Sequence, residues 1–401
     1  MSRAGPARLR TLDDLGQLAG KQALVRCDFN VPLEGGRITD DLRIRATIPT
    51  LIELLGHGAD LVLCSHLGRP KGTRDPRFSL APVSARLSEL LDRDVTQCGG
   101  VVGSEARFCS GRLRPGDLML LENLRFDPRE EANDPGFAEE LASLAEVYVD
   151  DAFGAAHRAH ASVVGVARLL PSTAGRLMQK EIEALSRLRD DAEKPFVAIL
   201  GGAKVSDKLA AIDALIERVD ALLIGGAMAF SFLASAGGQV GKSLVEPDRY
   251  DDIRAAVGKA EAMEVLIQLP EDVVASPKAS LDAKRETVRA DAIPRDSMGL
   301  DIGPRTVEEF ARTIADAKTI FWNGPMGVFE LEPFSAGTRG VATAVSSASG
   351  YSVVGGGDSL AALKKFDLLD GVDHLSTGGG ASLEFLEGRT LPGVEVLMEA
   401  P

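Results

Sequence analysis

The sequence has 401 residues, of which 45% are hydrophobic and 26% charged, and its formal net charge is −14. This length predicts two domains, with three as the alternative, each large enough for its own core. The acidic balance argues against nucleic acid or an anionic membrane surface as a general partner. No apolar stretch reaches the length of a membrane span and no hydrophobic signal region follows the first residues, so we expect a cytoplasmic protein. The four cysteines show no CxxC spacing, which favours free thiols.

In the first half of the chain, short apolar runs alternate with helical patterns. Strand-like runs cover residues 23–27, 61–64, 118–121 and 147–149, and a helical pattern covers 44–55. Strands that alternate with helices predict a parallel sheet covered on both faces. In such sheets, ligands bind beyond the carboxyl ends of the strands.

Polar and basic side chains recur just past these predicted strand ends. They are Asp28, Asn30, His66, Arg69, Arg125 and Arg158, with Arg43 near the start of the first helix. Their repetition predicts a basic pocket for a small phosphorylated acid, held by charge-assisted hydrogen bonds. For each arginine alone a surface salt bridge remains the alternative, and for His66 alone a structural histidine does.

A helical pattern over residues 172–188 is followed by a polar break at 189–195. We place the junction between the two domains here, with the helix as the connector.

The second half repeats the strand-then-helix rhythm, but its strands end in glycines. The octamer GGAKVSDK at 201–208 follows an apolar strand, 196–200, and precedes a helical pattern over 209–216. A glycine turn at a helix start leaves N–H groups facing outward, where they can bind an anion. Lys204 and Lys208 are four apart and would share one face of a helix. The octamer predicts a polyphosphate site; an ordinary glycine turn with two solvated lysines is the alternative.

Later glycine runs carry two further candidates. The N–H groups of Gly378–Gly380, just before a predicted helix, could form an anion nest. Asp358 follows three glycines and is a candidate Mg²⁺ ligand, because Mg²⁺ takes one or two carboxylates together with phosphates. The Gly241-Lys242-Ser243 segment is not a P-loop, since that motif needs glycine where Ala236 stands. No GxGxxG fingerprint occurs, which weakens a dinucleotide-binding interpretation.

Taken together, the motifs resemble those of phosphoglycerate kinases, in order from about residue 20 to 390. They are RCDFNVP (26–32), SHLGRP (65–70), ENLRF (122–126), DAFG (151–154), HRAH (157–160), GGAKVSDK (201–208), WNGPMGVFE (322–330), GGGDS (355–359) and STGGGAS (376–382). One departure is Arg305, which stands where the family more usually has lysine.

The resemblance implies an α/β protein with two doubly wound parallel-sheet, Rossmann-like domains that face each other across a cleft. Residues 1–171 would form the phosphoglycerate-binding domain, to which 389–401 return. Residues 172–188 would be the connecting helix, and 189–388 the nucleotide-binding domain.

The implied reaction is the reversible, Mg²⁺-dependent transfer of the acyl phosphate of 1,3-bisphosphoglycerate to ADP, giving ATP and 3-phosphoglycerate. By resemblance the phosphoglycerate would meet Asp28, Asn30, Arg43, His66, Arg69, Arg125 and Arg158. The transferring phosphoryl group would meet Arg43, Lys204, Gly378, Gly379 and Gly380. The nucleotide would meet Lys204, Lys208, Gly225, Gly226, Pro325, Glu330, Gly357, Asp358 and Ser359, with Asp358 on the Mg²⁺. We expect a monomer whose partners are these small molecules.

The residue chemistry agrees with this reaction. A carboxylate nucleophile is already ionised at neutral pH, so no general base is required, and the motifs offer none. What remains is charge neutralisation and in-line positioning, which we expect to involve closure of the two domains. Three alternatives stay open: a dehydrogenase, a two-domain solute-binding protein, and a relative that binds substrates without turnover.

Overall fold

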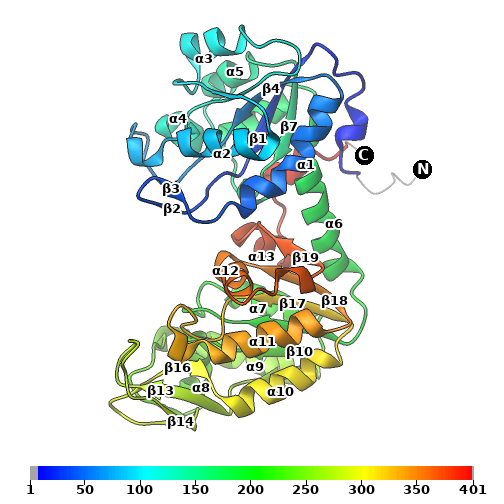
Figure 1. The fold of residues 1–401 in the computed structure, drawn as a ribbon. Helices are drawn as coiled ribbons and strands as arrows, with labels where there is room; N and C mark the ends of the chain where they lie inside the picture. The colour runs from blue at the N-terminus through cyan, green and yellow to red at the C-terminus, as the bar shows by residue number, and fades with distance from the viewer. Residues whose placement is uncertain (1–7, 400–401) are drawn as a thin grey trace, which may run out of the picture. The chain divides into compact units, whose positions relative to one another are not determined.

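The computed structural model describes residues 8–399; the ends of the predicted first domain and of its returning tail, 1–7 and 400–401, lie outside the described residues. The chain divides into two compact units. One holds the described residues up to Glu183 and those from Thr390 onward; the other is Ala184–Arg389. Helix α6 (Arg176–Asp190) passes from the first unit into the second. Each unit is an α/β structure in which helices flank a six-stranded sheet (Figure 1).

The sheet of the first unit is parallel throughout, with strand order β5-β6-β4-β1-β7-β8. Its strands are β1 (Gln22–Cys27), β4 (Asp60–Cys64), β5 (Val95–Gln97), β6 (Leu118–Leu120), β7 (Val147–Asp151) and β8 (Ser172–Ala174). Its helices are α1 (Leu42–Gly56), α2 (Ala81–Leu91), α3 (Gly103–Ser110), α4 (Pro128–Glu131), α5 (Pro135–Ala142) and, in the returning tail, α14 (Pro392–Glu395). A small hairpin, β2 (Leu33–Glu34) and β3 (Arg37–Ile38), follows β1. The parallel sheet and the strands predicted in this half are confirmed.

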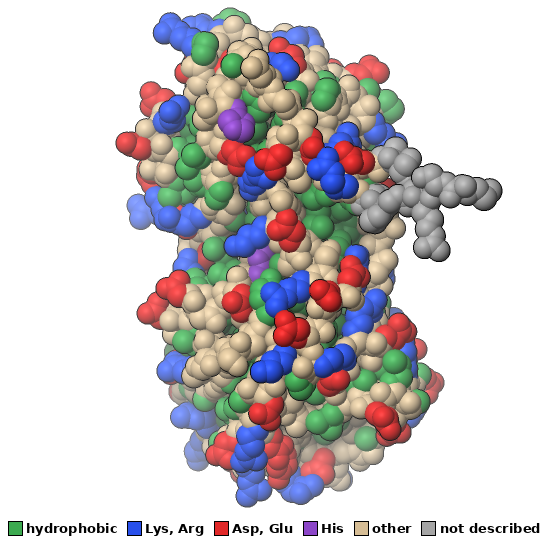
Figure 2. Space-filling model, turned by 90° about the vertical axis from the view of Figure 1, so that its right-hand side faces the viewer, with side chains coloured by type: hydrophobic (Ala, Val, Ile, Leu, Met, Phe, Trp, Pro, Cys, Tyr) green, Lys and Arg blue, Asp and Glu red, His purple; other side chains and the backbone are tan. Residues whose placement is uncertain are grey.

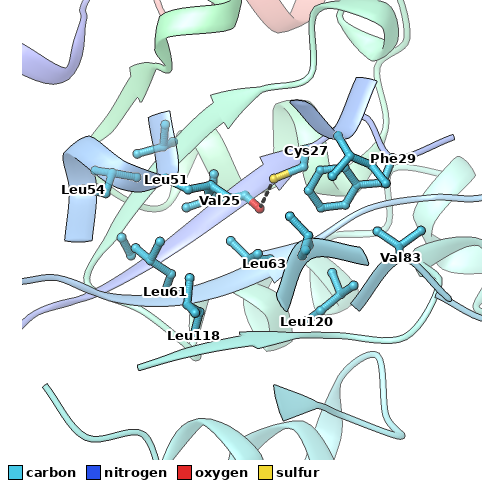
Figure 3. Close-up of a cluster of buried hydrophobic side chains, with 14 of the residues drawn as sticks. Val25, Cys27, Phe29, Leu51, Leu54, Leu61, Leu63, Val83, Leu118 and Leu120 are labelled. Carbon is cyan, nitrogen blue, oxygen red and sulfur yellow. Dashed lines mark hydrogen bonds between the residues drawn. The ribbon is translucent and has the colours of Figure 1, made fainter. Parts of the chain in front are cut away.

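The core of this unit explains why its strands are nearly continuous apolar runs. Alternate residues of β1 and β4, such as Val25 and Leu63, point to the same side of the sheet (Figure 3). Leu51 and Leu54 of α1 cover them there and belong to the same buried cluster. Strands of a parallel sheet lie between two helical layers, so both of their faces must be apolar.

The predicted helix over 172–188 is wrong at its start. Residues 172–174 form β8, which pairs with β7, and α6 begins only at Arg176. The Asp151 carboxylate at the end of β7 accepts the N–H groups of Leu177 and Met178 at 2.9 and 3.2 Å, and so caps the helix. An added Cβ at Gly175 would lie 2.2 Å from that carboxylate, so the capping group itself fills the space beside the helix start.

The second unit has the strand order β12-β10-β9-β17-β18-β19, again all parallel. These strands are β9 (Phe196–Leu200), β10 (Ala221–Ile224), β12 (Leu266–Gln268), β17 (Thr319–Asn323), β18 (Tyr351–Gly355) and β19 (His374–Ser376). The helices are α7 (Leu209–Ile216), α8 (Met228–Ser235), α9 (Tyr250–Ala262), α10 (Pro304–Ala315), α11 (Ala336–Ser347), α12 (Gly357–Lys365) and α13 (Gly380–Leu386). In chain order the strands read 3-2-1-4-5-6, the order of a doubly wound fold, whose switch point lies between β9 and β17.

Two small sheets in the second unit were not predicted. An antiparallel sheet joins β14 (Glu286–Arg289), β13 (Asp272–Ser276) and β16 (Met298–Ile302), and β11 (Gln239–Val240) pairs with β15 (Ala292–Ile293). The strand-then-helix rhythm is interrupted here, so periodicity gave no sign of them.

The described end of the chain is tied to the first unit by backbone hydrogen bonds. The N–H of Arg10 donates to the Leu397 carbonyl at 3.0 Å, and the N–H of Gly393 donates to the Ala156 carbonyl at 2.8 Å. The returning segment is therefore part of this unit's structure rather than a loose tail.

The hydropathy of the helices, the surface charge and the state of the cysteines can be compared with what the composition predicts. Within residues 8–399, none of the helices has the length and hydropathy that crossing a bilayer requires. Acidic and basic side chains are interspersed over the face that Figure 2 shows. The four cysteines are free, as predicted, and Cys27, Cys64 and Cys98 are buried.

The buried carboxyl of Asp150, in β7, makes the stability of the first unit depend on pH. One of its oxygens accepts the Ala152 N–H at 3.0 Å, and the other has no hydrogen-bond partner. Burial raises the pKa of Asp150 from 3.8 to about 7. The folded state therefore holds this proton more tightly, and the stabilisation is complete below about pH 4 and lost as the pH rises through 7.

We predict that Asp150→Asn weakens this pH dependence, because the amide keeps the shape and cannot ionise. Between pH 5 and 7 the free energy of unfolding should fall less in the variant than in the wild type, by at most about 3 kcal/mol. Urea denaturation at the two pH values measures this; an equal fall in both proteins would contradict the assignment.

Candidate functional site

The first unit gathers the predicted phosphoglycerate residues at one edge of its sheet. Strands β6, β4, β1 and β7 are neighbours and parallel, so their carboxyl ends lie at the same edge. The residues just beyond those ends are Asp28 and Asn30 after β1, His66 and Arg69 after β4, Arg125 after β6 and Arg158 after β7.

His66 lies close enough to four arginines to be affected by their charge. Its Nδ1 is 3.1 Å from a terminal nitrogen of the buried Arg26. Arginine can only donate, so Nδ1 is the acceptor and the ring hydrogen is on Nε2. Burial, followed by the positive charges of Arg26, Arg125, Arg43 and Arg158, lowers the pKa of His66 well below its usual value. The imidazole is therefore neutral and can donate from Nε2 to an anion.

Several of the residues predicted to bind the phosphoglycerate already form contacts within the first unit. Arg43 forms an ion pair with the buried Asp28 at 2.8 Å. Asn30 accepts the Gly68 N–H at 2.9 Å, and Arg125 donates to the Gly68 carbonyl at 2.8 Å. These contacts fix the directions of the side chains before any ligand arrives.

In the second unit, the predicted nucleotide loops meet at the switch point. The N–H groups of Gly201 and Gly202 donate to the carbonyls of Asn323 and Pro325, both at 3.0 Å. The Gly226 N–H donates to the Met326 carbonyl at 3.1 Å. The prediction that the first two glycines leave their N–H groups facing outward is therefore wrong, since the segment after β17 accepts them.

This close contact is why glycine stands at two of these positions. An added Cβ at Gly201 would lie 2.2 Å from the Pro325 carbonyl oxygen. Gly226 has a φ of +65°, and an added Cβ there would lie 2.5 Å from the Gly202 nitrogen. Both glycines serve the contact of one loop with another.

The two lysines of the octamer do not share a helix face, because α7 begins after Lys208. Lys204 is exposed, whereas Lys208 is half-buried. The Lys208 ammonium donates to the Asn323 carbonyl at 3.3 Å and to its side-chain oxygen. Burial lowers the pKa of Lys208 to about 8, although Asp207 and Asp358 act in the opposite direction. A bound phosphate would favour its charged form further.

Two adjoining cavities lie at the switch point and share Gly202, Ala203, Pro325 and Asp358 in their linings. The first, of about 270 Å³, is mainly apolar and includes Gly226, Pro325 and Glu330 among the predicted nucleotide residues. The second is lined by Lys204, Lys208, Gly357, Asp358, Ser359 and Gly380. The structure thus places an apolar compartment beside a charged one, and Asp358 lies in the lining of both.

Some predicted residues have a structural contact that the sequence did not reveal. Gly225 is not in the lining of the first cavity, and an added Cβ there would be 2.4 Å from the Met326 sulfur. The buried Ser359 hydroxyl accepts the Gly324 N–H at 2.6 Å. Gly378 and Gly379 precede α13 and are not among the described residues that line the two cavities.

The apolar cavity also includes residues that the sequence analysis missed. Phe230, Leu244, Met298, Leu300 and Val328 line it. Met298 and Leu300 belong to β16 of the unpredicted antiparallel sheet, so no motif pointed to them. Arg305 lies outside this lining; its side chain is 74% exposed and pairs with Glu271 at 3.4 Å.

Three comparisons connect this geometry to known proteins. A family model described as phosphoglycerate kinase matches residues 12–389. The chain is 55% identical over 391 residues to a phosphoglycerate kinase of Thermomicrobium roseum, covering 98% of this chain and 100% of that protein. It is 56% identical over 390 residues to one of Thermus thermophilus, covering 97% and 100%.

Solved structures agree. A phosphoglycerate kinase from Coxiella burnetii has a TM-score of 0.85 at 41% identity, with 97% of this chain and 99% of that chain covered. One from Pyrococcus horikoshii has a TM-score of 0.87 at 33% identity, with 97% and 98% covered. The chain belongs to the phosphoglycerate kinase family, the phosphotransferases of an ATP-generating step of glycolysis.

Proposed function

We propose that the first unit binds the phosphoglycerate and the second binds the nucleotide, and that transfer proceeds by charge neutralisation and in-line positioning. The observation that carries this proposal is the second cavity, where two lysines, two aspartates and the open glycines Gly357 and Gly380 surround one space at the switch point. Cations and a carboxylate in one cavity suit a nucleotide phosphate chain with its metal ion.

We assign the phosphoglycerate to the residues at the edge of the first sheet: Asp28, Asn30, Arg43, His66, Arg69, Arg125 and Arg158. The neutral His66 with its Nε2 hydrogen supports this, because it adds a directed donor among the guanidinium groups. Arginine forks match carboxylate and phosphate oxygens in two-point contacts.

We assign the nucleoside to the apolar cavity, beside Gly225, Gly226, Pro325 and Glu330, with the ribose hydroxyls on Glu330. The phosphate chain would meet Lys208, Gly357 and Ser359 in the charged cavity, with Mg²⁺ on Asp358. Among residues 8–399 no group of three His, Cys, Asp or Glu side chains could hold a metal alone. A single carboxylate completed by phosphate oxygens suits Mg²⁺, which supplies neutralisation of phosphate charge when bound.

The transferring phosphoryl group would meet Arg43, Lys204 and the glycines Gly378, Gly379 and Gly380. At Gly357 and Gly380 φ is not positive and an added Cβ would meet nothing in the protein. Neither the backbone conformation nor a neighbouring atom therefore calls for glycine there, which leaves room for a ligand to approach the backbone.

The acceptor in the ATP-consuming direction is a carboxylate, which is ionised at neutral pH. No residue needs to remove a proton from it. The cations instead lower the repulsion between this carboxylate and the phosphoryl oxygens and hold both in line. The family's place in glycolysis supports the proposal of a cytoplasmic location, and a monomeric state stays a prediction from the sequence.

We predict that Lys204→Ala lowers kcat about 10²-fold or more, because it removes one preorganised cation from the transferring group. The measurement is the Mg-ATP-dependent phosphorylation of 3-phosphoglycerate, coupled to reduction of the product. A variant with near-normal turnover would show that the lysine is wrongly assigned.

The matched comparison is Arg125→Ala in the first unit. It should mainly raise the KM for phosphoglycerate and leave the KM for ATP unchanged. If the affinity for ATP falls instead, the substrates are assigned to the wrong units.

Because the two substrates are assigned to different units, we infer that the units approach each other before transfer. Closure would also exclude the water that could hydrolyse an acyl phosphate. The radius of gyration from small-angle scattering should fall when both substrates are added together. An unchanged radius with both ligands bound would contradict closure.

A further inference from the structure

Glu246 lies in the segment between β11 and α9, and its carboxylate contacts the middle of the lysine loop, residues 201–208. The Glu246 Oε2 accepts the N–H of Val205 at 2.7 Å and that of Ser206 at 3.1 Å. Its Oε1 accepts the Ser206 hydroxyl at 2.6 Å. Both carboxylate oxygens are therefore engaged with the two residues that separate Lys204 from Asp207.

Glu246 is itself held by the fold. Its N–H donates to the hydroxyl of Ser231 at 3.0 Å, and Ser231 is a buried residue of α8. Pro247 follows and fixes the local backbone. The carboxylate thus connects the lysine loop to a helix that begins just after β10.

The loop is fixed at both ends and depends on Glu246 between them. At its start, Gly201 and Gly202 are bonded to the segment after β17. At its end, the Lys208 N–H donates to the Val205 carbonyl at 2.9 Å and α7 begins. The Glu246 carboxylate binds N–H groups of the turn that precedes α7, near the positive end of that helix, where negative charge is stabilising.

Charge strengthens these contacts. Partial burial favours the neutral acid, but the hydrogen bonds from Ser206 and Val205 and the nearby Lys204 charge outweigh it and hold the pKa of Glu246 below its usual value. The side chain is ionised at neutral pH, so its three hydrogen bonds are charge-assisted.

We propose that Glu246 is a positioning residue for phosphoryl transfer: its carboxylate fixes the Val205–Ser206 backbone and so sets where the ammonium groups of Lys204 and Lys208 lie. This inference rests on the proposed role of the two lysines. Because the N–H groups of Val205 and Ser206 already donate to Glu246, these two groups do not take part in binding an anion.

The test is Glu246→Gln, which keeps the size of the side chain and removes its charge. A misplaced cation lowers the rate of phosphoryl transfer more than it weakens the binding of the substrate. We therefore expect kcat to fall roughly 10- to 100-fold, with a smaller change in the KM for ATP. The KM for phosphoglycerate should not change. Asp248→Asn is the matched control, because that side chain lies two residues on, is 80% exposed and should leave kcat unchanged.

A double-mutant cycle separates positioning from general loss of stability. In a Lys204→Ala background, Glu246→Gln should lower kcat by a smaller factor than in the wild type, because one of the two cations that it positions is gone. The inference would be overturned if the two substitutions lowered kcat by independent factors that multiply in the double variant. It would also be overturned by a folded Glu246→Gln variant with kcat within twofold of the wild type. If Lys204→Ala itself keeps normal turnover, the proposed function fails instead.

Ser206→Ala is a second variant should Glu246→Gln not fold. It removes only the hydroxyl bond to Oε1 and leaves both N–H bonds, so its kcat should lie between those of the wild type and the Gln variant. An unchanged kcat in Ser206→Ala, with the hydrogen exchange of the Val205 and Ser206 amides also unchanged, would count against the positioning role.

Discussion

The second unit depends on the direct backbone contact of three loops at the switch point of its sheet. The loops after β9, β10 and β17 donate and accept hydrogen bonds among themselves, and the approach is closer than any Cβ allows at Gly201. This contact fixes the shared wall of the two cavities. A wall built from backbone is rigid, because its atoms have no rotamers to change. The charged side chains are arranged on that rigid base.

Both units hold charged side chains in place through contacts within the protein. The first unit holds several guanidinium groups around a neutral His66, and internal contacts such as the Arg43–Asp28 pair orient them. The second unit holds Lys208 half-buried against Asn323. A reaction whose nucleophile is already ionised needs such preorganised cations and no proton acceptor. The dehydrogenase and solute-binding alternatives are wrong, since the chain belongs to a kinase family.

The fold was largely predictable because buried parallel strands appear in the sequence as continuous apolar runs; β9 and α7 have the predicted bounds. Two of the errors share a cause, namely contacts between residues distant in sequence. The start of α6 depends on a cap from Asp151, and the orientation of the Gly201 N–H depends on Asn323. Glu246 stands in no motif, so only its hydrogen bonds to the lysine loop reveal it. Residue types and motifs identify the site's chemistry, while tertiary contacts decide which groups remain available to a ligand.

The most direct test of the account is whether the chain phosphorylates 3-phosphoglycerate with Mg-ATP, followed by coupled reduction of the acyl phosphate. We expect turnover that requires Mg²⁺ and that needs no group titrating as a general base, so kcat should vary little between pH 6 and 7.5. Calorimetry showing that both ligands bind while no product forms would contradict the account and identify a binding relative without catalysis.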